Sequence, residues 1–370
     1  MSDTVSRRSL IQGACALAAA PLLPPAFAQE RRYEPQVGPW RGFETTTTVT
    51  VADHQGTTRV WLPLPDVETD YQRSLGHDWT GNATTLKLVA DAERGVRMLY
   101  AEFPPGVGAP TFTLVSRLQT RGRSIDWSKP GRASEDPEVL RAALAPSELM
   151  PTDGIVRKTA LEATRGARTE IDKVQALYRW VVTHAHREPK VKGCGTGDVR
   201  TMLETGNLAG KCADLNAVFV AMSRSVGIPA RDVYGLRVAP SAFGYRELGA
   251  GNPASLKSAQ HCRAEVYLRQ HGWVAMDPAD VLKVMRQETP EWIRDPAHPV
   301  AAPVNKGLFG HWEGNWIAYN TAHDVRLPGS AGKGTLPFLM YPQGENASGA
   351  FDSLSPDSFR YTISARELGA

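Results

Sequence analysis

Cysteine is scarce in this chain, and the short motifs that usually bind metals or nucleotides are absent. Only four cysteines occur among 370 residues, and no pair has the Cys-x-x-Cys spacing of zinc and redox sites. The sequence also has no His-Glu-x-x-His helix motif and no glycine loop ending in Lys-Ser or Lys-Thr, the phosphate-binding pattern. We therefore expect neither a metal nor a cofactor.

A charge excess and long apolar runs are also missing. Lysine and arginine number 42 against 39 acidic residues, a formal net charge of +3, and the two signs are mixed along the chain. This balance is typical of an ordinary soluble surface and gives no sign of a nucleic-acid partner. After residue 28, no apolar stretch reaches the roughly 20 residues that cross a bilayer, so we expect no stable membrane insertion.

The first 28 residues have the organisation of an export signal. Two adjacent arginines stand in Ser6–Leu10, a moderately apolar run covers residues 11–23, and Ala26-Phe-Ala28 is a small-x-small cleavage site. The apolar run is too short and too interrupted by proline to span a membrane. We predict twin-arginine export, cleavage after Ala28 and a mature protein in the periplasm or beyond.

Three further segments follow from the hydrophobic patterns. Residues 29–130 contain short β-branched stretches at 45–51, 59–64, 85–89, 96–103 and 111–118, separated by Gly and Pro clusters. This pattern predicts a β-sandwich-like domain. Residues 131–290 turn helical, with helices expected at 136–145, at 154–162 and after the capping residue Thr169. Residues 291–370 are rich in Trp, Gly and Pro, and we expect a β-rich extension with strands at 316–319 and 336–341.

A helix predicted to begin just after Gly210 and to continue to about Val226 brings Cys212 into or next to its first turn. Apolar residues recur there at helical spacing, at Leu215, Val218, Phe219, Met222 and Val226. Gly227 and Pro229 are the expected stop. The unpaired N–H groups and the positive dipole at a helix start favour a thiolate over a thiol, which suits a nucleophile. The alternative is an inert cysteine packed in the core.

The possible partners of Cys212 lie downstream. Residues 261–268 and 273–277 predict two strands joined by a turn that contains glycine. In such a hairpin, Asp277 returns to within a residue or two of the position opposite His261, where the two side chains can meet. An acid beside a histidine fixes the imidazole tautomer and stabilises the imidazolium.

Several motifs in order resemble the core of the transglutaminase-like superfamily. They are Gly-x-Cys-x-Asp at 210–214, Gly-Ile-Pro-Ala-Arg at 227–231, His261 opening a strand that reaches Glu265-Val-Tyr, and Gly-Trp-Val-x-x-Asp-Pro at 272–278. The resemblance covers about residues 170–285. It implies an α+β, papain-like core preceded by a β-domain, and a catalytic triad of Cys212, His261 and Asp277. One departure is Arg263, which stands where the family usually has an aromatic residue.

The remaining cysteines and the neighbouring glycines allow further expectations. In an oxidising compartment we predict a Cys194–Cys262 disulfide, with two buried free thiols as the alternative. A zinc site made by these two with Cys212 and His261 is disfavoured, because adjacent strand residues point to opposite faces. We interpret the glycine-rich run 192–198 as a mobile loop near the cleft. Asp214 is expected to interact with the helix dipole or to accept hydrogen bonds near the site rather than to act as an acid.

The predicted chemistry is attack of the Cys212 thiolate on an amide carbonyl of a peptide or protein, with a thioester intermediate. Water would complete the cycle of an amidase or peptidase, and an amine that of a transglutaminase. The sequence leaves the two open. An arylamine acetyltransferase is disfavoured, because export removes the chain from cytosolic acetyl-CoA. A non-catalytic periplasmic binding or scaffold protein that keeps the fold is the alternative from another class.

Overall fold

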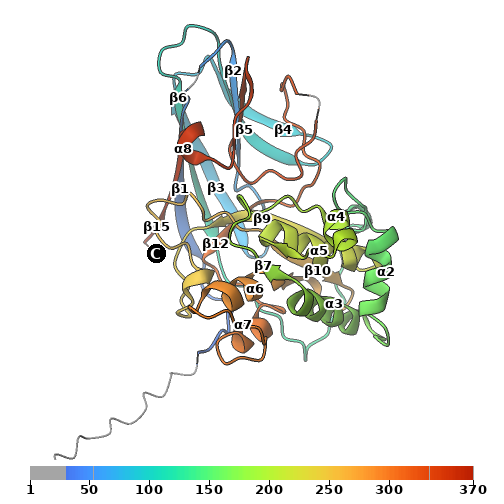
Figure 1. Ribbon diagram of the computed structural model, residues 1–370. Helices are drawn as coiled ribbons and strands as arrows, with labels where there is room; N and C mark the ends of the chain where they lie inside the picture. Colours follow the sequence, from blue (N-terminus) through green and yellow to red (C-terminus); the bar gives the residue numbers. More distant parts are fainter. Residues whose placement is uncertain (1–30, 53, 333, 370) are drawn as a thin grey trace, which may run out of the picture. The chain divides into compact units, whose positions relative to one another are not determined.

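A computed structural model describes residues 31–52, 54–332 and 334–369. The predicted export signal at residues 1–28 lies outside this part of the chain. The residues from Arg31 onward form one compact unit, drawn in Figure 1. Among the residues described, no helix combines the length and apolarity needed to cross a bilayer.

Two antiparallel sheets come mainly from the first third of the chain. Their strand orders are β15-β1-β6-β3 and β14-β13-β2-β5-β4. The strands from this part are β1 (Arg41–Thr50), β2 (Thr58–Pro63), β3 (Gln72–Gly81), β4 (Thr85–Asp91), β5 (Val96–Phe103) and β6 (Thr111–Thr120). Side chains along β6 alternate between buried and half-buried, as expected where one sheet face meets a core. The strands predicted at 45–51, 59–64, 85–89, 96–103 and 111–118 are confirmed, and β3 is a strand that the sequence analysis missed.

The segment after residue 290 adds strands to all three of the larger sheets. These strands are β12 (Trp316–Asn320), β13 (Gln343–Asn346), β14 (Gly349–Ala350) and β15 (Tyr361–Leu368). β15 pairs with β1 along eight residue pairs, and β13 pairs with β2. The strand predicted at 336–341 is wrong, because only an isolated bridge from Leu336 to Val325 forms there. Pro337 and Pro342 lack the N–H group that a strand ladder requires.

The α+β core is organised around one sheet and one central helix. The sheet has the order β11-β10-β9-β12, with β9 (Ala230–Arg237), β10 (Arg263–Leu268) and β11 (Gly272–Met276). The helices and short elements of the core region are α1 (Pro137–Ala142), α2 (Gly154–Ala163), α3 (Glu170–His184), α4 (Val199–Thr205), α5 (Cys212–Ser225), α6 (Pro278–Gln287), α7 (Ala302–Gly307), β7 (His186–Arg187), β8 (Ala209–Gly210) and η1 (Arg246–Leu248); α8 (Pro356–Phe359) follows near the end of the chain. Figure 1 shows α5 at the centre of this group.

Helix α5 is buried over its whole length. It contacts α2, α3, α6, β9 and β10, so it is enclosed by helices on one side and by the sheet on the other. Leu215, Val218, Phe219 and Met222 have no exposed surface. Each such side chain contributes about 1.5–3 kcal/mol by leaving water. The apolar stripe predicted from the sequence therefore fixes this helix, and with it the position of Cys212.

The strands from the first third of the chain contact the core sheet at its edge strand β12. Gln72, at the start of β3, donates a hydrogen bond to the carbonyl of Ala318 (2.8 Å) and accepts one from its N–H (2.6 Å). Thr120, at the end of β6, donates to the carbonyl of Trp316 at 3.2 Å.

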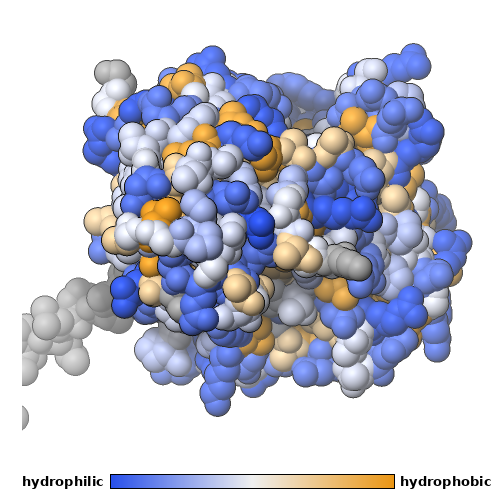
Figure 2. Space-filling model, turned by 90° about the horizontal axis from the view of Figure 1, so that it is seen from above, coloured by the Kyte–Doolittle hydropathy of each residue, from blue (hydrophilic) through white to orange (hydrophobic). Residues whose placement is uncertain are grey.

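The surface in Figure 2 is mostly hydrophilic, and its apolar residues form scattered patches.

Candidate active site

Cys212 is the first residue of α5 and is only 3% exposed. Its thiol interacts electrostatically with His261, Cys194 and Cys262. Burial raises the pKa of this thiol, but its interactions with Cys194, Cys262 and His261 outweigh that effect. The net result is a pKa well below the usual range. A thiolate at the start of a helix is the form that can act as a nucleophile or metal ligand.

His261 stands immediately before β10, and its backbone is held from two sides. Its N–H donates to the carbonyl of Gly235 at 2.9 Å, and its carbonyl accepts from the indole of Trp316 at 2.8 Å. The ring nitrogen Nε2 lies 2.7 Å from Oδ2 of Asp277. Because Nε2 is engaged by the carboxylate, Nδ1 is the ring nitrogen left for Cys212.

The imidazole of His261 is held in its charged form. Burial and the nearby Arg237 lower its pKa, whereas Asp280 and Asp277 raise it, and the balance is a pKa of about 9. Burial raises the pKa of Asp277, and the adjacent Asp280 charge adds to the rise. At neutral pH the cationic imidazole therefore faces a carboxylate on one side and the Cys212 thiol on the other.

Asp277 joins the two helix starts that meet at the site. It is the N-cap of α6, and its Oδ1 accepts from the backbone N–H of Asp280 at 3.1 Å. The same oxygen accepts from Nδ2 of Asn216 at 3.3 Å, and that amide also donates to the carbonyl of Cys262 at 2.9 Å. Asn216 lies one turn after Cys212 on α5, so one amide couples the helix of the thiol to the acid that orients the histidine.

Arg263, the departure from the family pattern, is a buried part of the same cluster. Its guanidinium lies 4.7 Å from the ring centre of Trp316 and 5.3 Å from that of Trp312. Its Nε is 3.8 Å from Oδ2 of Asp277, and its Nη1 donates to the carbonyl of Glu313. The cation therefore occupies an aromatic-lined space behind Asp277, where it stabilises the carboxylate.

Asp214 anchors the glycine-rich loop beside Cys212. Its carboxylate accepts from the backbone N–H groups of Thr196 and Gly197, both at 2.9 Å, and of Lys211 at 3.0 Å. Gly195 has a φ of +90°, and a Cβ there would lie 1.8 Å from Oδ2 of Asp214. Burial raises the pKa of Asp214 although three N–H groups oppose the shift. The geometry matches the accepting role predicted for this residue.

The predicted Cys194–Cys262 disulfide is not formed. Cys194, Cys212 and Cys262 are free and buried among the residues described. The thiols of Cys194 and Cys262 each interact with the thiol of Cys212 instead. Cys194 donates its S–H to the carbonyl of Gln260 at 3.3 Å.

The zinc alternative has no support in the geometry of the described residues. The group there whose ligand atoms are close enough for a metal comprises His261, Asp277 and Asp280, without a cysteine. Asp280 in this group already binds Arg237, with oxygen distances of 2.5 and 2.6 Å. We therefore interpret the three residues as an ion-pair network.

Comparison with known proteins places this geometry in a family. The sequence profile of the transglutaminase-like superfamily matches residues 157–278, which include Cys212, His261 and Asp277. An uncharacterized protein of Haemophilus influenzae is 30% identical over 338 residues, which cover 88% of this chain and 90% of that protein. The chain belongs to the transglutaminase-like superfamily. The uncharacterized protein YebA of Bacillus subtilis is 21% identical over 241 residues, 63% of this chain and 30% of that protein.

Comparison with solved structures finds matches of low sequence identity. A proposed cysteine protease of Cytophaga hutchinsonii is 15% identical, with a TM-score of 0.49, and the match covers 90% of this chain and 99% of that one. The periplasmic domain of TgpA from Pseudomonas aeruginosa is also 15% identical, with a TM-score of 0.34 over 68% of this chain and 90% of that one. The transglutaminase-like superfamily consists generally of cysteine-dependent enzymes.

The sequence analysis missed four polar residues of this transglutaminase-like site: Asn216, Arg237, the inward position of Arg263, and Asp280. For Asp280 a signal existed, because Asp-Pro-Ala-Asp has an N-cap acid, a proline at the first helical position and an acid at the third. Asn216 could have been found as the residue one turn after Cys212. Arg237 had no local signal, because only strand pairing brings it to the histidine.

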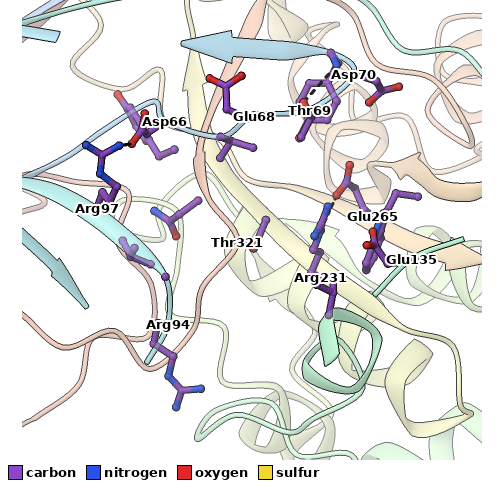
Figure 3. Close-up of a pocket in the computed structure, with 18 of the residues that line it drawn as sticks. Asp66, Glu68, Thr69, Asp70, Arg94, Arg97, Glu135, Arg231, Glu265 and Thr321 are labelled. Carbon is purple, nitrogen blue, oxygen red and sulfur yellow. Dashed lines mark hydrogen bonds and ion pairs between the residues drawn. The ribbon is translucent and has the colours of Figure 1, made fainter. Parts of the chain in front are cut away.

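A separate cavity of about 500 Å³ lies between the sandwich and the core sheet. Figure 3 shows Arg231 and Glu265 pointing toward one another on one wall, and Asp66 paired with Arg97 on another. Glu265 is also bound by Arg123. The lining contains no residue of the candidate triad, so this cavity is not the space around Cys212.

Proposed function

We propose that this protein is an exported cysteine-dependent acyl-transfer enzyme that acts on amide bonds of peptides or proteins through Cys212, His261 and Asp277. One observation carries the proposal. A thiol at a helix start interacts electrostatically with an imidazole whose Nε2 binds a buried carboxylate at 2.7 Å. This arrangement has the nucleophile, the base and the orienting acid in the order that thiol catalysis needs.

The first step in the proposed mechanism is attack of the Cys212 thiolate on the carbonyl carbon of the substrate amide. The carbonyl oxygen then becomes an oxyanion that needs donors. The N–H of Ala213 already donates to the carbonyl of Cys194, and that of Lys211 to Asp214. The N–H of Cys212 is therefore the candidate donor at the start of α5.

Collapse of the tetrahedral intermediate requires a proton for the leaving amine. The His261 imidazolium supplies it from Nδ1, and Asp277 holds the ring during the transfer. The C–N bond breaks, the amine leaves, and the acyl group remains on sulfur as a thioester. His261, now neutral, can take a proton from water or from an incoming amine. We propose hydrolysis as the default outcome, because water greatly outnumbers amines in a dilute periplasm.

Denatured casein with a biotinylated alkylamine tests this proposal without knowledge of the natural substrate. We expect the mature protein to release new amino groups or ammonia, or to incorporate the amine. Cys212→Ala should abolish all of these activities, whereas Asp78→Asn, at an exposed side chain on β3, should keep them. Turnover that persists in Cys212→Ala would refute the mechanism. Absence of turnover, together with no acyl adduct on Cys212 from reactive esters, would favour the scaffold alternative.

A further inference from the structure

Two carboxylates, not one, lie against the same nitrogen of His261. Nε2 is 2.7 Å from Oδ2 of Asp277 and 3.2 Å from Oδ2 of Asp280. Both acids belong to the start of α6, where Asp277 is the N-cap and Asp280 is the third helical residue. The backbone N–H of Asp280 donates to Asp277, so the helix start fixes the spacing of the two acids. Their negative charges also suit the positive end of the helix dipole.

Arg237 holds Asp280 in this position. Its Nη2 lies 2.5 Å from Oδ1 and 2.6 Å from Oδ2 of Asp280, and its Nε donates to the carbonyl of Leu248. Arg237 is 3% exposed and Asp280 is 2% exposed. Burial raises the pKa of Asp280, but Arg237 and His261 outweigh it and keep that carboxyl ionised. The acid thus pairs with a buried cation on one side and with the imidazole on the other.

The charges around the imidazole balance only when Asp280 is counted. Arg237 acts on it from β9, and Arg263 on β10 lies beside Asp277, while Asp277 and Asp280 contact it from the start of α6. These four charges sum to zero, so the imidazolium that forms when His261 takes the proton of Cys212 adds its single positive charge to an otherwise neutral set. Without Asp280, the same transfer would place a third cation beside two arginines with one carboxylate.

The other titratable groups near these acids include two phenols and one amine. Tyr33 and Tyr178 interact electrostatically with Asp277 and Asp280. Burial raises the pKa of both phenols well above their usual value, so both stay neutral. Lys283 also acts on Asp280 from α6, and burial lowers its pKa to about 8. The amine of Lys283 donates to the carbonyl of Glu247.

We propose that Asp280 is a positioning residue of this site: it shares the Nε2 proton of His261 with Asp277 and neutralises Arg237. The group that activates Cys212 is then an imidazole whose Nε2 contacts two carboxylates, where a triad has a single acid. This role depends on the proposed function in one respect, because it assumes that Cys212 is the nucleophile. The effect of Asp280 on the imidazole itself does not depend on any substrate.

The proposal predicts shifts of opposite sign for the two partners. Asp280→Asn leaves Arg237 beside the imidazole without its counter-charge, so His261 should titrate about 1 to 3 pH units lower. Arg237→Gln leaves Asp280 unopposed, so His261 should titrate higher than in the unaltered protein. A general loosening of the fold would move both variants in the same direction. Opposite shifts therefore separate a positioning role from a merely structural one.

NMR of the mature protein with labelled histidine measures these titrations, with His261→Ala identifying the resonance. Glu265→Gln is the matched control, because Glu265 is also a buried acid bound by two arginines, Arg231 and Arg123, but does not touch His261. We expect a downward shift in Asp280→Asn, an upward shift in Arg237→Gln and no shift in the control. A titration unchanged in Asp280→Asn, or shifts of the same sign in both variants, would overturn the proposal.

Asp277→Asn provides a second measurement if a single variant at Asp280 or Arg237 fails to fold. His261 then keeps Asp280, so it should titrate within about one unit of the ordinary value near 6.5. Buried His323 is the internal reference, because burial and nearby arginines lower its pKa well below that value. Behaviour of His261 like that of His323 would overturn the proposal. A correct titration pattern without acyl transfer by Cys212 would refute the proposed function and leave the role of Asp280 in place.

Discussion

Asp232→Asn should make the stability of the protein less sensitive to pH. Asp232 is fully buried on β9, and neither carboxyl oxygen has a hydrogen-bond partner among the residues described. Its neighbour His323, with Nε2 at 3.4 Å, stays neutral because burial lowers the pKa of that imidazole. Burial raises the pKa of Asp232 from 3.8 to about 7, although Arg224 opposes the shift. An asparagine has nearly the same shape and cannot ionise.

The magnitude follows from the difference between the folded and unfolded pKa of Asp232. A rise of about 3 units corresponds to about 4 kcal/mol of differential free energy. The folded state prefers the protonated acid, so this contribution is fully present below the unfolded pKa. This stabilising contribution is lost as pH rises from about 4 to about 7, and above pH 7 the folded protein holds Asp232 as a buried charge. Asp232→Asn should not show this loss.

Denaturant unfolding between pH 4.5 and pH 8 measures the effect. We expect the free energy of unfolding of Asp232→Asn, relative to the unaltered protein, to increase by about 3–4 kcal/mol across this range. The many other titrating groups cancel in the difference, because they are the same in both proteins. Asp78→Asn, at a side chain that is 72% exposed, is the control and should show little change. A difference independent of pH would show that Asp232 is ionised and solvated, and would refute the reasoning.

Three further predictions concern the packing around the site. Asn216→Ala removes the amide that donates to Asp277. The free energy of unfolding, measured with denaturant, should fall by about 1–3 kcal/mol, and alkylation of Cys212 should slow. An unaltered stability would contradict the coupling of the two helix starts. Gly195→Ala should destabilise the protein by at least about 1 kcal/mol, because the residue has φ +90° and its new Cβ would collide with Asp214. The loss should shrink when Asp214→Ala is added, and a loss of equal size in both backgrounds would refute the steric explanation. Mild oxidation with a small disulfide should form a bridge from Cys212 to Cys194 or to Cys262, and peptide mapping identifies the bridge. A bridge between Cys194 and Cys262 that leaves Cys212 free would contradict the clustering of the thiols.

The parts of the site that the sequence predicted depend on local patterns. The position of Cys212 follows from a helical stripe and a stop signal within a few residues of one another, and α5 begins at Cys212. The hairpin of His261 and Asp277 is also local, since one short turn sets its register, with Ala264 opposite Met276. Thr169 caps α3 as predicted, together with Asp172. Such features need only the spacing of residues along the chain.

The parts that the sequence did not predict depend on pairing over long distances. β15 lies beside β1 although nearly the whole chain separates them, and no local pattern encodes that partner. Strand β3 contains serine, histidine, aspartate and glycine, and its pairing with β6 holds it in the sheet. Arg237 on β9 and Asp280 on α6 likewise meet only when distant segments of the chain pack together. The disulfide prediction failed because it counted cysteines without knowing that Cys212 would contact both of the others.

The most direct test of the central claim is the pH dependence of iodoacetamide labelling, read at each cysteine by mass spectrometry. The account predicts fast labelling of Cys212 near pH 6, because its pKa is lowered, and slow labelling of Cys194 and Cys262, whose pKa values are raised. The fast reaction should disappear in His261→Ala. Labelling of Cys212 only above about pH 8.5, the ordinary thiol value, or labelling unaffected by His261→Ala, would contradict the account.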